Sequence, residues 1–455
     1  MTADSSSGSA EHPQRVGGAQ WWYRLGLAAL APALCGFFAH RITLGGKPTV
    51  GLRERLGWLP ESVVAACRRS PGDRMVWIHA VSVGEAVPAQ ALAAAIQSID
   101  SSVRIVVSST TPGGREMAQS RLPFACAFFY LPYDLPWCVE RTLDAVSPDA
   151  LVIMETELWP NLLAAARERG IRTMIANARI SDRAFGRFLR FRWLYRWVLS
   201  NVDLVAAQSP LCAQRFLDLG ARPGRVQVLG NLKFDEARPD VSEDQCRELR
   251  GRLGFDERDL VLVFGSTAPE ENEALLDAFA VIRAEETRAR LIMAPRHLER
   301  VPDCVRAAEQ HGFRTILRSQ LPADGDNDRI VVLDTFGELA TLYALSAVAF
   351  IGRSLVPLGG GNLLQPLGFA VPVVFGPHME NFREAARSAL EAGLAFEVAS
   401  SGDLAEVCCR LLRSPDERAR IAERAPAFLA DNAGAAGRHA EALAGLLGWC
   451  GTEAQ

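Results

Sequence analysis

Residues 75–85 read MVWIHAVSVGE, an apolar run followed by a short turn and an acidic residue. The run Met75–His79, which is apolar up to its final histidine, is typical of a buried β-strand. From Ala86 to Ile99 the spacing of apolar residues changes to that of a helix. These residues therefore predict one strand–turn–helix unit of an α/β domain.

The same alternation of short apolar strands and amphipathic helices continues along the chain. Further strands are expected at residues 105–109, 125–130, 150–154, 173–177, 204–208, 260–265, 289–293, 330–333, 348–351 and 371–375. Apolar strands separated by helices are typical of a parallel sheet covered on both faces. We therefore expect two Rossmann-like domains in sequence, with ligands beyond the carboxyl ends of the strands.

A polar, charged stretch after residues 231–235 separates the two halves. The expected organisation is a disordered N-terminus (1–19), a membrane anchor (20–45), an N-terminal domain (46–235), a linker (236–251) and a C-terminal domain (252–445).

The N-terminal segment begins with Trp21, Trp22 and Tyr23 and carries no charge from Leu25 to Ala39. The run is short for a bilayer span, which needs about 20 apolar residues. Its aromatic start and basic flanks suit a membrane interface. A signal peptide and a buried core helix are the alternatives, and the first lacks a clear cleavage pattern.

Composition limits the function. A net charge of −4 argues against a general nucleic-acid binder. The ten cysteines show neither zinc-site spacing nor a disulfide framework, which is typical of buried or incidental thiols in a reducing compartment.

Three segments of the first half place charged residues at strand ends. Glu85 follows the first strand, where a helix dipole would keep a general base ionised, although it could be a plain helix-start residue. Glu155 and Glu157 follow the strand at 150–154 and would be costly if buried unpaired. Lys233 lies at the interdomain turn, where it could neutralise developing charge or be a solvated linker residue.

Four loops of the second half follow strands in the same way. They contain Gly265-Ser-Thr267, Pro295-Arg-His297, Asp334-Thr-Phe-Gly-Glu-Leu339 and Gly359-Gly-Gly-Asn362. Backbone N–H groups at helix starts bind phosphate, and glycine lets the backbone approach closely. Each loop alone is a weak signal, but together they favour a nucleotide site, with Arg296 on phosphate.

The chain resembles the 3-deoxy-D-manno-octulosonic acid (Kdo) transferase family of lipopolysaccharide biosynthesis from about residue 20 to about residue 445. The resemblance rests on WIHAVSVGE, YLPYDLPW, METELWPN, ANARISDR, GNLKFD, GSTAPEE, APRHLERV, DTFGEL and the block from SLVPLGG to FGPHMENF, in the family's order.

The resemblance implies a GT-B glycosyltransferase fold and inverting transfer of Kdo from CMP-Kdo to the 6′-hydroxyl of lipid IVA, without a metal or cofactor. It implies an acceptor-binding N-terminal domain and attachment to the cytoplasmic side of the inner membrane. Glu85 would be the base, and Glu155 and Lys233 would support the transition state. CMP would contact Pro295, Arg296, Phe336, Gly337, Glu338, Asn362, Leu363, Leu364 and Gln365.

The chain departs from the family pattern in its last glycine-rich loop. Where the family usually reads GGHNPLEPAALG, Gly361 replaces the histidine and Gln365 replaces the acid; Phe336 replaces a methionine. Gln365 still accepts a hydrogen bond, but more weakly than a carboxylate. Two alternatives follow: a nucleotide- or lipid-binding protein without catalysis, and an inverting transferase with another donor.

Overall fold

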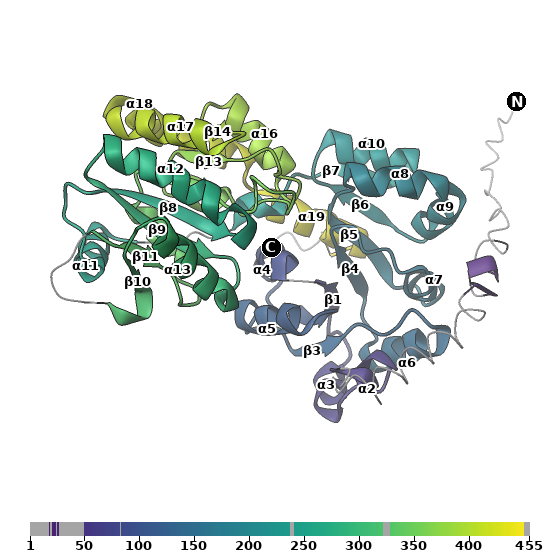
Figure 1. The fold of residues 1–455 in the computed structure, drawn as a ribbon. Coiled ribbons are helices and arrows are strands. Elements are labelled where there is room, and N and C mark those ends of the chain that lie inside the picture. Colours follow the sequence, from purple (N-terminus) through teal and green to yellow (C-terminus); the bar gives the residue numbers. More distant parts are fainter. Residues whose placement is uncertain are drawn as a thin grey trace, which may run out of the picture. The chain divides into compact units, whose positions relative to one another are not determined.

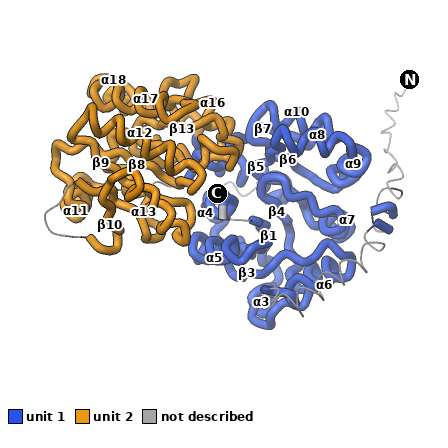
Figure 2. Tube along the Cα trace, viewed as in Figure 1, with its two compact units in different colours: residues 1–236, 433–455 blue, residues 237–432 orange. Residues whose placement is uncertain are grey.

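In the computed structural model of this chain, the described residues are 18, 21–23, 25–26, 50–81, 83–236, 241–321 and 328–449. The chain divides into unit 1, residues 1–236 with 433–455, and unit 2, residues 237–432 (Figure 2). Apart from residue 18, the expected disordered N-terminus lies outside the described residues, and so does most of the expected anchor. Within those ranges, no helix combines the length and apolar character that a membrane span needs.

Unit 1 is built on a parallel sheet in the order β3-β2-β1-β4-β5-β6-β7 (Figure 1). Its strands are β1 (Met75–His79), β2 (Arg104–Ser109), β3 (Ala127–Tyr130), β4 (Ala150–Met154), β5 (Arg172–Ala178), β6 (Leu204–Ala207) and β7 (Val226–Val228). Its helices are α2 (Leu52–Arg55), α3 (Glu61–Cys67), α4 (Val83–Ile99), α5 (Pro112–Arg121), α6 (Pro136–Val146), α7 (Pro160–Glu168), α8 (Asp182–Arg190), α9 (Arg192–Ser200), α10 (Pro210–Asp218) and α19 (Ala435–Leu447), with 3₁₀ turns η1 (Pro223–Arg225) and η2 (Leu232–Asp235).

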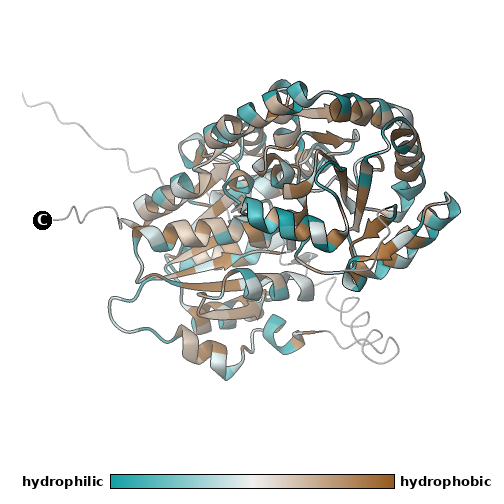
Figure 3. Cartoon of the chain, turned by 90° about the vertical axis from the view of Figure 1, so that its left-hand side faces the viewer, coloured by the Kyte–Doolittle hydropathy of each residue, from teal (hydrophilic) through white to brown (hydrophobic). Residues whose placement is uncertain are grey.

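Both faces of this sheet are covered, because successive side chains of a strand point to opposite sides. Trp77 packs into a core with residues of α6, α7 and α9. Its neighbour Val76 packs into a second core with residues of α4 and α19. Every residue of β1 and β4 is accordingly buried. Brown, hydrophobic colouring predominates on the strands visible in Figure 3. The prediction of a parallel sheet buried on both faces is confirmed.

Unit 2 is a second parallel sheet, in the order β10-β11-β9-β8-β12-β13-β14. Its strands are β8 (Leu260–Thr267), β9 (Ala289–Pro295), β10 (Thr315–Leu317), β11 (Ile330–Val332), β12 (Val348–Ile351), β13 (Val373–Phe375) and β14 (Ala395–Glu397). Its helices are α11 (Glu243–Leu253), α12 (Asn272–Glu285), α13 (Val301–Gln310), α14 (Leu339–Leu342), α15 (Leu364–Gly368), α16 (Arg383–Glu391), α17 (Ser401–Arg413) and α18 (Pro415–Asn432), with 3₁₀ turns η3 (Pro269–Glu271), η4 (Leu298–Arg300), η5 (Arg318–Gln320) and η6 (Tyr343–Leu345).

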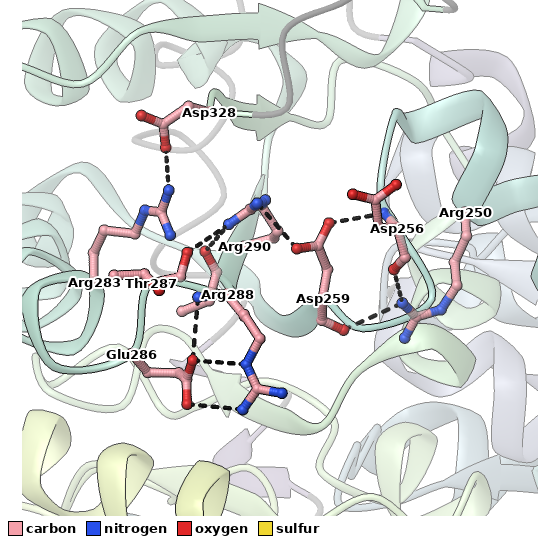
Figure 4. A network of polar contacts seen from close by, with 10 residues as sticks. Arg250, Asp256, Asp259, Arg283, Glu286, Thr287, Arg288, Arg290 and Asp328 are labelled. Carbon is pink, nitrogen blue, oxygen red and sulfur yellow. Dashed lines mark hydrogen bonds and ion pairs between the residues drawn. The ribbon is translucent and has the colours of Figure 1, made fainter.

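A polar network closes the amino edge of this sheet (Figure 4). Arg290 pairs with Asp259 at 3.0 Å, and their side chains are only 13% and 5% exposed. Arg250 donates to the carbonyls of Asp256 and Asp259 at 3.0 and 3.2 Å. A buried pair of this kind fixes geometry more than it adds stability, because desolvating two charges offsets their attraction. A cavity of about 230 Å³ opens beside Arg290, at the edge opposite the strands' carboxyl ends.

The expected domain boundary is wrong at the C-terminus, because residues 433–455 belong to unit 1 rather than to the second domain. Asp235 accepts the N–H groups of Gly434 and Ala436, both at 2.6 Å. His439 Nε2 accepts the N–H of Asn177 at 3.1 Å. Long-range hydrogen bonds therefore fix α19 to unit 1. The local sequence of α19 contains no signal for these contacts, so its place in unit 1 was not predicted.

The expected linker is also corrected, because α11 forms most of it. Ser242 and Gln245 form a capping box at its start, and Gly254 in the left-handed conformation ends it. Its polar composition reflects an exposed surface helix. Every expected strand is present with small shifts of its ends, whereas β7, β10 and β14 were not predicted.

Candidate functional site

The connectivity of unit 1 places a ligand site beyond β1 and β4. Strands β2 and β3 lie successively on one side of β1, and the next strand in the sequence, β4, lies on the other side of β1. Ligands bind at such a switch point, beyond the carboxyl ends of the two strands. Glu85 follows β1 and Glu155 follows β4, so both lie at this point.

Glu155 is the centre of a buried ionic cluster. It adopts a left-handed φ of 58° and donates its N–H to Ala176 O at 2.8 Å. Its two carboxylate oxygens pair with Lys233 Nζ at 3.1 Å and Arg179 Nε at 2.6 Å. Burial opposes ionisation, but Lys233 and Arg179 hold the pKa of Glu155 below its usual value. Glu155 is therefore a buried carboxylate with two cationic partners.

Lys233 is positioned by the turn in which it lies. Its N–H donates to Asn231 Oδ1, and the N–H of Leu232 donates to Asn177 Oδ1, both at 3.0 Å. The Lys233 residue is only 8% exposed. The alternative of a solvated linker lysine is therefore wrong.

Glu85 lies in the first turn of α4, and its Oε2 accepts the N–H of Val81 at 2.6 Å. Burial raises the pKa of Glu85 to about 8, and the negative charge of Glu155 acts in the same direction. The expectation that the helix dipole would keep Glu85 ionised is wrong, because desolvation and a neighbouring like charge outweigh it. Glu85 and Glu155 thus have opposite pKa shifts, which is typical of sites that use one carboxyl for proton transfer.

Part of the YLPYDLPW and METELWPN strings is structural. Asp134 accepts the N–H groups of Asn161 and Leu162 at 3.0 and 2.9 Å, which caps the start of α7. Tyr23 donates to the same carboxylate at 2.8 Å. The pKa of Glu157 is raised, and the cause of this shift is burial. These residues fix the loop that carries Glu155.

Unit 2 has the same switch in strand order between β8 and β12. Pro295 ends β9 and is paired in register with Thr267 of β8, and Arg296 follows it with an exposed side chain. A Cβ atom on Gly361 would lie 3.1 Å from Ser266, so this glycine allows a close approach of two loops. The expected loops therefore end at one edge of the sheet.

The expected CMP contacts at residues 336–338 differ in whether their side chains are free to meet a ligand. Phe336 is 79% exposed, and Gly337 has a φ of 89°. Glu338 pairs with Arg318 at 3.0 Å and accepts from Thr335. This loop thus offers an exposed aromatic ring, whereas its carboxylate already has partners.

The last loop reaches the same edge through residues 362–365. The side chains of Leu363 and Leu364 are buried, so only their backbone could meet a ligand. Asn362 Oδ1 accepts the N–H of Leu364 at 2.9 Å, and Gln365 is half-buried. Because α15 has only five residues, we do not assign phosphate binding to its dipole.

Arg179 is the site residue that the sequence did not single out. It follows β5 in the ANARISDR string, next to the β4 end that carries Glu155. Its position after a buried strand, like that of Glu85, was the available signal.

Comparisons with known proteins identify relatives of this chain. Residues 50–236 match the family described as 3-Deoxy-D-manno-octulosonic-acid transferase (kdotransferase). A 3-deoxy-D-manno-octulosonic acid transferase of Haemophilus influenzae is 33% identical, with 84% of this chain and 88% of the relative covered. One of Bordetella pertussis is 32% identical, with 94% and 99% covered. A glycosyltransferase structure from Rickettsia africae (TM-score 0.59, 11% identity, 83% and 99% covered) shares the fold alone.

Proposed function

This chain belongs to the Kdo transferase family, and we propose that it transfers Kdo from CMP-Kdo to the 6′-hydroxyl of lipid IVA with inversion at the anomeric carbon. The observation that carries the proposal is the pair of carboxyls at the switch point of unit 1. Glu155 is ionised beside two cations, and Glu85 is a carboxyl whose pKa is about 8. The two relatives are 3-deoxy-D-manno-octulosonic acid transferases, which supports Kdo as the transferred sugar.

Glu85 acts as the general base in this proposal. Its carboxylate takes the proton of the acceptor hydroxyl while the hydroxyl oxygen bonds to the anomeric carbon. The bond from that carbon to the phosphate oxygen breaks, and CMP leaves with the electron pair as an anion. A base with a raised pKa takes a proton more readily than an ordinary glutamate. One displacement inverts the centre, so a second, nucleophilic carboxylate is not required.

Glu155 and Lys233 support this step through Glu85. The charge of Glu155 raises the proton affinity of Glu85, and Lys233 and Arg179 keep Glu155 charged in a buried position. The ammonium of Lys233 lies 3.1 Å from Glu155, so we propose that its support for the transition state passes through this ion pair.

On unit 2, we propose that Arg296 binds the donor phosphate and that the exposed ring of Phe336 stacks on cytosine. The backbones of Pro295, Gly337, Leu363 and Leu364, and the side chains of Glu338, Asn362 and Gln365, are proposed to complete the CMP site. Gln365 stands where the family usually has an acid. This substitution favours the alternatives of weaker CMP-Kdo binding or of a different sugar nucleotide as donor.

The test is CMP release by the purified full chain. We expect release to require both CMP-Kdo and lipid IVA. Tight CMP binding without release would favour a nucleotide-binding protein, and release with another sugar nucleotide would favour a different donor.

The pH dependence of transfer follows from Glu85. Only its deprotonated form accepts a proton, so kcat/KM should rise with pH and level off above about 8. Glu155→Gln should move the midpoint to lower pH, because it removes a charge that raises the pKa of Glu85. Initial rates from about pH 6 to about pH 9 check this. A rate that stays constant across this range, as expected for a glutamate with the ordinary pKa of 4.5, would contradict the proposed base.

We further propose that α8 and α9 meet the anionic, cytoplasmic face of the inner membrane. Their exposed basic residues are Arg183, Arg187, Arg190, Arg192 and Arg196. Three large apolar side chains between them, Leu189, Phe191 and Trp193, are 41%, 55% and 53% exposed. Asp182 is the acidic residue of these helices. Basic and aromatic side chains on one surface suit anionic headgroups and the interface below them.

Charge reversal tests this surface. Changing Arg187, Arg190 and Arg192 to Glu should lower binding to vesicles of phosphatidylcholine and phosphatidylglycerol by at least about 10-fold, since each basic residue contributes about 1 kcal/mol. The matched control changes three exposed arginines of unit 2, Arg247, Arg306 and Arg387. Equal losses in both triple variants would argue against a dedicated surface.

A further inference from the structure

Two neighbouring strand ends of unit 2 carry residues in a conformation that non-glycine residues avoid. Ser266 has a φ of 59° and Arg353 a φ of 61°. They lie at the carboxyl ends of β8 and β12, which pair through Gly265 and Ile351 at the switch in strand order. Such residues cost about 1–3 kcal/mol each and concentrate at functional sites. The two residues therefore lie at the edge of the sheet where the donor site is proposed.

A buried carboxylate holds the Arg353 backbone in place. Glu271 is only 1% exposed, and its Oε1 accepts the N–H groups of Arg353 at 2.5 Å and Ala268 at 3.0 Å. On the other side, the N–H of Gly360 donates to Arg353 O at 2.9 Å. Arg353 is thus fixed between the β8 loop and the glycine-rich loop.

No residue larger than glycine fits at position 352, directly before Arg353. A Cβ atom on Gly352 would lie 2.6 Å from Ser266 O and Thr267 Cα, and 2.7 Å from Glu271 Oε1. The chain therefore passes directly over Thr267 before it reaches Arg353.

Arg296 reaches the same place from the other strand. Its N–H donates to Thr267 O at 3.0 Å, so the two arginines flank one residue. Although Arg296 is exposed, partial desolvation of its guanidinium lowers its pKa, and the charge of Arg353 acts in the same direction. Among the described residues, neither guanidinium forms an ion pair with a carboxylate. The Nη2 atom of Arg353 donates a hydrogen bond to Leu358 O at 2.5 Å. Two close positive charges without an acid are suited to a doubly charged anion.

We propose that Arg353 is a second phosphate-binding arginine of the donor site, acting with Arg296 on the phosphate of CMP, and that Glu271 is its positioning residue. The proposal rests on the proposed function, because that function places CMP on unit 2. Phosphate is favoured because a planar guanidinium binds it through two parallel hydrogen bonds. Two arginines that flank one residue can meet on a single phosphate group.

Calorimetry of the full chain with CMP and cytidine tests Arg353, because cytidine lacks the phosphate. Arg353→Gln should weaken CMP about 10-fold, the size expected for one charge-assisted hydrogen bond, and leave cytidine unchanged. Arg353→Lys should fall between the two, since an ammonium keeps the charge without the paired geometry. The control Arg387→Gln removes an arginine that is 71% exposed on α16 and should bind CMP normally.

The outcomes separate this inference from the proposed function. If the wild type binds CMP no better than cytidine, the donor site itself is wrong. If the wild type prefers CMP and Arg353→Gln keeps that preference, only the role of Arg353 is wrong. An unchanged CMP affinity with a raised KM for CMP-Kdo would also overturn it, because Arg353 would then bind the sugar.

Glu271 has its own readout. Glu271→Ala should weaken CMP relative to cytidine, and Glu271→Gln should restore it, because glutamine keeps one carbonyl oxygen for the two N–H groups. Equal losses for CMP and cytidine in both variants would mark a structural role only and contradict positioning.

Discussion

Glu85→Gln is expected to lower kcat for Kdo transfer by about 10²- to 10⁴-fold, the usual contribution of a general base. Glutamine keeps the size of the side chain and can still accept the N–H of Val81, but it cannot take the proton of the acceptor hydroxyl. CMP affinity should remain nearly unchanged, because Glu85 belongs to unit 1 and the proposed CMP contacts belong to unit 2.

The matched control is Glu61→Gln, an exposed acid in the first turn of α3 in the same unit. It should leave both rate and CMP affinity at the wild-type values. Transfer by Glu85→Gln at more than about a tenth of the wild-type rate would remove Glu85 from the role of base. Loss of CMP binding in that variant would contradict the assignment of the donor to unit 2.

Lys233→Met should be strongly destabilising. It leaves Glu155, which is 7% exposed, with Arg179 as its remaining charged partner. Removing one member of a buried ion pair costs about 3–5 kcal/mol, and the retained Arg179 places the expected loss near about 3 kcal/mol. Transfer should fall as well. Loss of Lys233 removes a positive charge from Glu155, and the charge of Glu155 acts on the pKa of Glu85.

Tryptophan fluorescence isolates the relevant transition. All nine tryptophans lie in the residues assigned to unit 1, so their emission during urea unfolding reports on that unit. Arg247→Met, which breaks an exposed pair on unit 2, should leave the fluorescence midpoint in place. An unchanged midpoint in Lys233→Met would show that the pair with Glu155 has no structural importance.

The sequence predicted the fold well where burial is complete. The observed bounds of β1, β4 and β12 match the predicted ones, because all of their residues are buried and, apart from His79 at the end of β1, apolar. The missed strands β7, β10 and β14 are three-residue edge strands with partly exposed side chains, which leave no apolar run to detect.

The candidate site was predicted in its residues but not in its electrostatics. The order of strands and helices placed Glu85, Glu155 and Lys233 at strand ends and turns. It did not report that Lys233 and Arg179 share Glu155, nor that burial reverses the effect of the helix dipole on Glu85. Those properties arise from residues brought together by tertiary packing. The return of α19 to unit 1 was unpredictable for the same reason.

The most direct test is the mass of the lipid after incubation of lipid IVA and CMP-Kdo with the wild type and Glu85→Gln in parallel. We expect the wild type to convert lipid IVA to a species heavier by whole Kdo residues, with one CMP released for each. Glu85→Gln, at equal CMP occupancy, should leave the lipid unmodified. Unmodified lipid with the wild type, or equal conversion by both proteins, would contradict Kdo transfer by a Glu85-dependent site.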